Sequence, residues 1–315
     1  MAQEHEEDGV CLYWGGDIGC RAARTRKRAG DCRGFACPGA RRVARRGPSV
    51  RVRACVATGY GINADEELAL AFEMAGARAL RMHVHELAEA PGQLDSFQIL
   101  AFPGGFSFGD HLGSGKVFAT LFRRSLGAAL EKFVFRGGLV VGVCNGFQAL
   151  VKMGFLPDLK GAHCQEVSLI HNDSGKFEDR WVRVGFETSC PCLWTRGLSE
   201  MDLPVRHGEG KFVTESAKVL TDLESRNLVA LRYRERGAGG TVDYPDDPNG
   251  SANHIAGICD PTGRVFGLMP HPEAFLYPEN HPDWTRLPSA SRSPSSEGQG
   301  LVIFRNGVNA ARTAR

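Results

Sequence analysis

The chain has 315 residues, of which 42% are hydrophobic, a size and composition typical of a globular protein with a substantial core. It contains no apolar run near the roughly eighteen residues of a membrane helix, and its acidic opening stretch lacks the features of a signal or transit peptide. The net charge of +2 is unevenly distributed, because residues 1–53 hold 12 of the 38 Lys and Arg but only six of the 36 Asp and Glu. We therefore expect a cytoplasmic protein with no membrane contact, whose body shows no basic excess for binding nucleic acid.

Residues 1–48 have an unusual composition. Between residues 21 and 48, 21 of 28 positions are Ala, Arg, Gly or Pro, with no helical or strand periodicity. Such a segment has too few large apolar groups to offset the entropy of ordering, so we predict a disordered extension. It is either translated sequence upstream of the true start or, as the weaker alternative, a functional basic arm.

The ten cysteines do not indicate a disulfide framework or a metal site. They are scattered along a chain without a secretory signal, and the four in the N-terminal extension have spacings unlike those of zinc ligands. In the remaining sequence Cys190 and Cys192 form the one close pair, with no second pair to complete a site. We expect reduced thiols and no metal.

The first half of the body alternates predicted strands and helices. Strands are expected over 49–57, 79–84, 97–103 and 138–143, and helices after residue 64 and over 115–135 and 145–153. Asn63 is expected to cap the first helix, with Glu66 completing a capping box. This alternation predicts a mostly parallel sheet with helices on both faces.

Beyond Gly161 the pattern changes to short strands and loops. The stretches "RWVRVGFE", "KFVTES", "LVALRYRE", "HIAGICD" and "VFGLMP" are predicted to add a smaller mixed or antiparallel edge to the same domain, which would cover 49–315. Residues 286–299, rich in Ser and Pro, are expected to form a flexible loop.

Cys144 lies where the apolar strand 138–143 meets the next helix. Sites in parallel sheets lie beyond the carboxyl ends of strands, and Gly-x-Cys-x-Gly, with Gly142 and Gly146, resembles a nucleophile elbow. A helix start favours a thiolate, and the following amide of Asn145 is placed to bind an oxyanion. From this motif alone, a packing cysteine beside a tight turn is an equally good interpretation.

Two further stretches supply the other parts of a thiol-based site. In "GLMPHPEAF", His271 and Glu273 are two residues apart between stiffening prolines, so the carboxylate could orient the imidazole as a base. A solvated His-x-Glu loop is the alternative. The glycine-rich "FPGGFSFGD" (102–110) follows a predicted strand and lacks the Gly-Lys-Ser/Thr ending of a P-loop, so it fits better as half of an oxyanion hole than as a phosphate loop. A tight surface turn remains possible for it.

Together these motifs resemble the class I glutamine amidotransferases, and more narrowly the glutaminase part of phosphoribosylformylglycinamidine synthase. The resemblance extends from about residue 52 to 310 and also includes "GINADEELALAFEMAGA", "NDSGKFEDRWV", "LPVRHGEGKF", "YPDDPNGS" and "IFRNGVN". It implies the flavodoxin-like fold of that class. Ala64 departs from the cysteine common at this position, and the first 48 residues have no counterpart in the family.

The resemblance implies a role for each part of the site. Cys144 would be the nucleophile, His271 the general base and acid, and Glu273 its orienting partner, with the backbone amides of Gly105 and Asn145 as the oxyanion hole. The implied reaction is hydrolysis of glutamine, with ammonia delivered to a synthetase.

The resemblance also implies substrate contacts, partners and cofactors. Gln148 would contact the glutamine substrate, with His207 and Glu209 as further candidates. The expected partners are the synthetase subunit and, as a further candidate, a small bridging subunit. ATP and Mg²⁺ are expected on the synthetase and no cofactor in this chain. Alternatives are a glutaminase of another amidotransferase, a cysteine hydrolase of related fold, a non-catalytic partner of the synthetase, or a nucleic-acid-binding module built on the Arg-rich extension.

Overall fold

The computed structural model describes residues 51–237, 241–286 and 296–313. Residues Ser49–Arg315 form one compact unit. The expected disorder of residues 1–48 concerns a segment outside the described residues, as does the expected flexibility of positions 287–295. Among the described residues, no helix is both long and apolar enough to cross a membrane.

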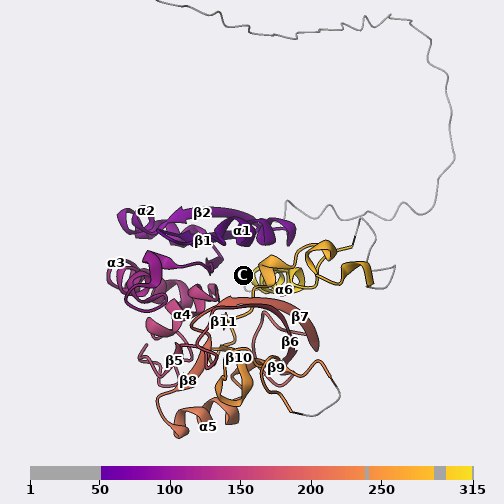
Figure 1. The fold of residues 1–315 in the computed structure, drawn as a ribbon. Coiled ribbons are helices and arrows are strands. Elements are labelled where there is room, and N and C mark those ends of the chain that lie inside the picture. Colours follow the sequence, from indigo (N-terminus) through magenta and orange to yellow (C-terminus); the bar gives the residue numbers. More distant parts are fainter. Residues whose placement is uncertain (1–50, 238–240, 287–295, 314–315) are drawn as a thin grey trace, which may run out of the picture. The chain divides into compact units, whose positions relative to one another are not determined.

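A nine-stranded sheet organises the fold, with the strand order β2-β1-β3-β4-β11-β10-β9-β6-β7 (Figure 1). The parallel half consists of β1 (Arg53–Thr58), β2 (Arg78–His83), β3 (Ile99–Phe102), β4 (Leu139–Val143) and β11 (Val265–Leu268). The antiparallel half consists of β10 (Ile255–Cys259), β9 (Val229–Arg234), β6 (Glu178–Phe186) and β7 (Glu200–His207). Two further strands, β5 (Val167–Ile170) and β8 (Lys211–Thr214), form a separate antiparallel pair.

Five of the six described α-helices form two groups, and the sixth contacts β8. The α-helices are α1 (Asp65–Met74), α2 (Val84–Glu89), α3 (Lys116–Phe135), α4 (Asn145–Lys152), α5 (Ala217–Ser225) and α6 (Leu301–Thr313). Short 3₁₀ turns cover Pro91–Ser96, Ser107–Asp110, Ala252–His254, Pro272–Ala274, Pro278–Asn280 and Trp284–Arg286. Helix α1 contacts α6 through an edge-to-face pair, Phe72 and Phe304, whereas α3 contacts α2 and α4. The predicted α/β fold with an antiparallel extension is confirmed.

Local predictions differed in accuracy. The strands expected in the first half all occur, and all five residues of β4 are buried, as the continuous apolar run predicts. Three helices and the strands β5 and β7 were not predicted. Helix α5 lies inside a region that was predicted to hold only strands and loops. Helix α6 has a helical apolar periodicity, but it comes directly after a polar stretch and was not recognised as a helix.

The predicted cap of α1 is wrong. Its N-cap is Ala64, without a side-chain hydrogen bond, and not Asn63. The backbone here is fixed by tertiary contacts, because Ile62 pairs with Gly105 and the Ala64 N–H donates to the Gly104 carbonyl at 3.3 Å. Glu66 therefore completes no capping box and pairs with Arg81 at 2.8 Å.

The two glycines around Cys144 allow α4 to approach the sheet closely. A Cβ on Gly146 would lie 2.0 Å from the Phe102 carbonyl oxygen of β3, and one on Gly142 would lie 2.7 Å from the backbone of Gly146. Neither contact is possible for a larger residue. Cys144 itself has φ 50° and ψ −107°, a conformation that is strained for any residue with a side chain. The chain therefore makes a sharp turn that is held by packing on both sides.

Candidate active site

The Cys144 thiol lies at the carboxyl end of β4, between that strand and α4. Its backbone N–H donates to the Leu268 carbonyl of β11 at 2.8 Å, which anchors the turn to the neighbouring strand. The sulfur lies 3.6 Å from the Arg206 carbonyl oxygen, so β7 forms the facing wall. The residue is 5% exposed. The side chain is thus held at the rim where parallel strands end, as the elbow interpretation predicts.

His271 and Glu273 form a buried pair just after β11. The Nδ1 atom of His271 lies 2.6 Å from Glu273 Oε1, and both residues are at most 5% exposed. Glu273 lies in a 3₁₀ turn that begins at Pro272, and the His271 backbone N–H donates to the Pro204 carbonyl of β7 at 2.8 Å. These contacts fix the imidazole orientation, and its Nε2 atom has no hydrogen-bond partner among the described residues.

Gly104 shows that the cysteine and histidine side chains face one another. A Cβ at this position would lie 2.7 Å from His271 Cε1 and 3.5 Å from Cys144 Cβ. Gly104 therefore packs against both side chains at the point where they approach each other. The structure brings together all three residues of the predicted triad, which come from segments far apart in the sequence.

Electrostatics favours a charged imidazole at this site. Burial alone would lower the pKa of His271, but the negative charges of Glu273 and Cys144, together with the hydrogen bond to Glu273, outweigh burial and raise it to about 10. The imidazolium state thus persists at neutral pH. An imidazolium stabilises a neighbouring thiolate and carries a proton that it can give to a leaving group.

The candidate oxyanion hole consists of two backbone amides. Asn145 is the first residue of α4, so its N–H has no acceptor within the helix. Gly105 has φ +142°, and a Cβ there would lie 2.8 Å from the backbone of Ile62 and Asn63. The next amide, that of Phe106, donates to the Gly61 carbonyl at 2.8 Å, whereas the Gly105 N–H has no partner in the described part of the chain. Gly105 is thus a free donor of this loop.

A cavity of about 200 Å³ lies beside Cys144 and includes Gln148, His207 and Glu209 in its lining. Its other lining residues are Gly105, Phe106, Asp110, Ser114, His171, Phe177, Arg206 and Gly208. Gln148 is almost fully buried and donates through Nε2 to the Glu209 carbonyl at 2.5 Å. All three predicted substrate residues therefore lie around one cavity next to the thiol.

His207 is held as a neutral hydrogen-bond acceptor. Asn172 donates through Nδ2 to the His207 carbonyl at 2.8 Å, so its Oδ1, 3.1 Å from the ring, accepts the Nδ1–H. This tautomer leaves Nε2 unprotonated, and that buried atom has no partner among the described residues. Burial and the nearby charge of His271 lower the pKa of His207 to about 3. Asn172 was not identified from the sequence, although it lies in the quoted stretch "NDSGKFEDRWV".

Two carboxylates line the cavity and bind backbone amides just before α3. Asp110 accepts from the Gly115 N–H at 3.1 Å, and Glu209 accepts from the Ser114 N–H at 3.2 Å. Negative charge is favourable near a helix N-terminus. Asp110 also accepts from the Asn145 side chain at 3.0 Å, which joins the glycine-rich loop to α4. Asp110 was missed from the sequence because nothing in "FPGGFSFGD" distinguishes a carboxylate that binds backbone amides from an ordinary loop residue.

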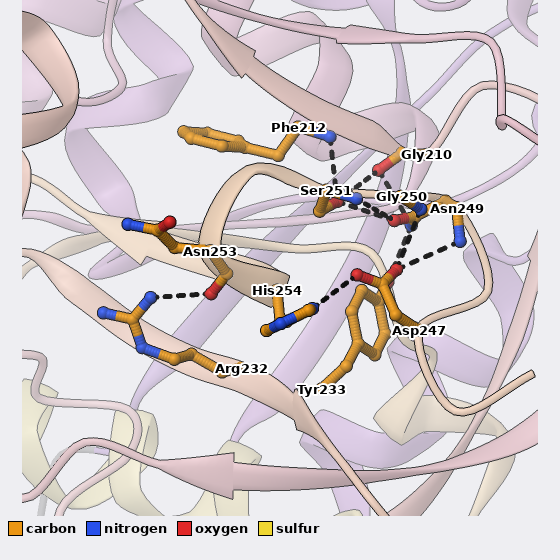
Figure 2. Close-up of polar contacts among 10 residues, drawn as sticks. All are labelled: Gly210, Phe212, Arg232, Tyr233, Asp247, Asn249, Gly250, Ser251, Asn253 and His254. Atoms are coloured by element: carbon orange, nitrogen blue, oxygen red, sulfur yellow. Dashed lines mark hydrogen bonds and ion pairs between the residues drawn. The ribbon is translucent and has the colours of Figure 1, made fainter. Parts of the chain in front are cut away.

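The "YPDDPNGS" stretch supports the turn at Gly210, which follows the strand that ends at His207 (Figure 2). Asn249 donates to the Gly210 carbonyl at 2.9 Å and to the Tyr233 hydroxyl at 3.0 Å, and Asp247 holds His254 at 2.8 Å. Gly210 packs tightly on the histidine, since a Cβ there would lie 2.4 Å from the His207 ring. This network therefore positions one wall of the cavity.

Comparison with known proteins defines the class. A family model described as the CobB/CobQ-like glutamine amidotransferase domain matches residues 51–309. The chain belongs to this glutamine amidotransferase family.

Individual relatives narrow the assignment. The chain is 41% identical to phosphoribosylformylglycinamidine synthase subunit PurQ of Dehalococcoides mccartyi, and the match covers 83% of this chain and 98% of that protein. It is 38% identical to human phosphoribosylformylglycinamidine synthase over 74% of this chain and 18% of the human one. Among solved structures, PurLQS from Thermotoga maritima matches with a TM-score of 0.60 and 28% identity, over 82% of this chain and 99% of that chain. The resemblance inferred from the sequence is confirmed.

Replacement of Gly104 by Ala tests the packing of the triad. The new Cβ would meet His271 Cε1 at 2.7 Å and displace the imidazole, so we expect glutaminase kcat to fall by roughly 100-fold with a nearly unchanged Tm. Gly92→Ala is the matched control, because a Cβ there meets nothing within 4 Å. Equal kcat values for the two variants would contradict the proposed contact.

The pH dependence tests the Glu273–His271 pair. Because the carboxylate helps to raise the pKa of His271 to about 10, activity that needs the imidazolium should be lost only as the pH rises through that value. In Glu273→Gln the pKa of His271 should fall, and the alkaline limb of the kcat/KM profile should move down by about one pH unit or more. The control is Glu67→Gln, because Glu67 lines the neighbouring cavity. In this variant the alkaline limb should stay at the wild-type pH. An unmoved limb in Glu273→Gln would exclude this carboxylate from the pair.

Proposed function

We propose that this chain is the glutaminase component of phosphoribosylformylglycinamidine synthase and that Cys144, His271 and Glu273 are its catalytic residues. It hydrolyses glutamine to glutamate and passes the ammonia to a synthetase, which converts formylglycinamide ribonucleotide to the amidine in purine biosynthesis. The observation that supports these roles most directly is the buried His271–Glu273 pair, with its second ring nitrogen unpartnered and a thiol facing the ring.

The proposed reaction proceeds in two stages. The Cys144 thiolate attacks the side-chain amide carbon of glutamine, and the amides of Gly105 and Asn145 stabilise the oxyanion that forms. The carbon–nitrogen bond then breaks as His271 gives its proton to the departing ammonia. Water attacks the resulting thioester, His271 takes up the water proton, and the carbon–sulfur bond breaks to release glutamate and restore the thiolate.

The cavity beside Cys144 offers complementary groups for free glutamine. Arg206, a lining residue whose guanidinium lies 3.8 Å from Asp179, is proposed to bind the α-carboxylate, whereas Glu209 supplies a negative charge for the α-ammonium. The buried, neutral His207 and Gln148 line the same cavity without adding charge. A volume of about 200 Å³ suits a small amino acid better than a peptide.

We also propose a docking surface for the synthetase beside the glutamine cavity. A larger cavity of about 700 Å³ shares His171 and Glu209 with it and is lined by four cations, Lys116, Arg123, Arg124 and Lys152. Lys152 feels the nearby charges of Glu209 and Asp110, and Arg123 donates to the Met153 carbonyl at 3.0 Å. The exposed side chains of Leu112 and Ile170 also line it. A group of cations with apolar neighbours suits an acidic surface of a protein partner. ATP and Mg²⁺ are proposed to bind the synthetase and not this chain.

Cys144→Ala tests the catalytic assignment in the assembled synthase. Glutamine-dependent amidation should be abolished, while synthesis from added ammonia should stay near the wild-type rate, because the synthetase site is untouched. An electrophilic glutamine analogue should label Cys144 in the wild-type chain, and excess glutamine should suppress the labelling. Equal loss of both activities in a normally assembled complex would contradict the ammonia-transfer model.

Charge reversal tests the docking surface. Arg124→Glu should weaken binding to the synthetase by roughly tenfold at low salt, measured by titration of one subunit with the other. Labelling of Cys144 by the glutamine analogue should be unchanged in the isolated variant. The control is Arg78→Glu on β2, a cation outside the cavity lining. Equal affinities of the two variants for the synthetase would refute this surface.

A further inference from the structure

Three cysteines meet at a site distinct from the catalytic centre. Cys190 and Cys192 follow β6, whereas Cys259 ends β10. The Cys190 and Cys259 sulfur atoms lie 3.4 Å apart although 69 residues separate them in the chain. A disulfide sulfur pair is about 2.0 Å apart, so a small side-chain rotation would bring the two sulfur atoms to bonding distance.

The backbone around these thiols is already held in place. The Leu193 N–H donates to the Gly263 carbonyl at 2.9 Å, and a Cβ on Gly263 would lie 2.1 Å from the Pro191 carbonyl oxygen. On the other side, the Cys259 N–H donates to the Leu228 carbonyl at 2.9 Å. The segment after β6 therefore packs directly on the turn between β10 and β11, so bond formation requires little backbone movement.

The two sulfur atoms have different chemical environments. Cys190 is partly exposed, whereas Cys259 is fully buried. The hydrogen-bonding contact with Cys259 and a hydrogen bond from the Cys192 backbone N–H lower the pKa of the Cys190 thiol. Contacts with the Cys190 and Cys192 side chains, together with burial, raise the pKa of Cys259. Cys190 is therefore the accessible nucleophilic sulfur and Cys259 the protonated partner behind it.

We propose that Cys190 and Cys259 form a peroxide-reactive dithiol, with Cys190 as the attacking sulfur and Cys259 as the resolving sulfur. The Cys190 thiolate attacks one oxygen of hydrogen peroxide, the oxygen–oxygen bond breaks, and the departing hydroxide takes up a proton, which leaves a sulfenic acid. Cys259 then attacks the Cys190 sulfur. The sulfur–sulfur bond forms, the sulfur–oxygen bond breaks, and the leaving hydroxide takes the Cys259 proton. In total, two thiols and one peroxide give one disulfide and two waters.

The disulfide would link two parts of the antiparallel half without touching the triad. Cys259 pairs with Phe266 near the start of β11, whereas His271 follows the other end of that strand. A bond that closes a loop of this length restricts the unfolded chain, so oxidation should stabilise the fold. This inference does not depend on the proposed function, because it rests on the thiol geometry alone.

The test uses the full chain carrying Cys144→Ser, which removes the other expected reactive thiol. After mild treatment with hydrogen peroxide, peptide mass spectrometry should find Cys190 linked to Cys259 as the main internal disulfide, and Tm should rise by roughly 5 °C or more. Cys164 is an exposed reference thiol outside the cluster. Over-oxidation of Cys190 at the same rate as Cys164, without a Cys190–Cys259 link, would overturn the proposal.

Two variants distinguish the roles of the neighbours. In Cys259→Ser the Cys190 sulfenic acid should persist and be trapped by a cyclic diketone, without the rise in Tm. In Cys192→Ser the Cys190–Cys259 link should still form. A link between Cys190 and Cys192 in the parent chain, or loss of the Cys190–Cys259 link in Cys192→Ser, would refute Cys259 as the resolving thiol.

Discussion

The active site depends on how closely α4 approaches the ends of β3 and β4. The approach is possible only because Gly142 and Gly146 lack side chains, since a Cβ on Gly146 would meet the Phe102 carbonyl at 2.0 Å. The same packing holds Cys144 at φ 50° and leaves the first amide of α4 without an acceptor. One steric constraint therefore fixes both the proposed nucleophile and one half of the proposed oxyanion hole. The glycine-rich loop, tied to α4 through the Asn145 side chain, contributes the other half.

The two buried histidines near this turn differ in charge. His271, paired with Glu273, is held as a cation, and His207 on the facing strand is held neutral by burial and by that same cation. The two buried imidazoles thus adopt opposite protonation states at one pH. Asp110 and Glu209 are placed where the N-terminus of α3 compensates their charge.

The residues of the site that could be predicted from the sequence are those that belong to a local sequence pattern. Cys144 could be found because a turn of this kind needs small flanking residues, and His271 with Glu273 because their spacing and the adjacent prolines restrict the backbone. The resemblance to the family then linked these motifs. Contacts between distant segments left no local signal. Asn172 fixes the tautomer of His207, which lies 35 residues further along the chain. Cys259 lies beside Cys190 because the fold brings the two segments together, although 69 residues separate them. The cap of α1 was mispredicted for the same reason, since pairing with the Gly104–Gly105 backbone overrides side-chain preference.

The position of β11 has a consequence for how the protein is made. This strand lies between β4, which is synthesised much earlier, and β10, and it leads directly to His271. A chain that still lacks β11 has neither the Leu268 carbonyl that anchors the Cys144 turn nor the imidazole of His271. The turn around Cys144 and the positive charge beside its sulfur are therefore completed by the same late event, the insertion of the last central strand.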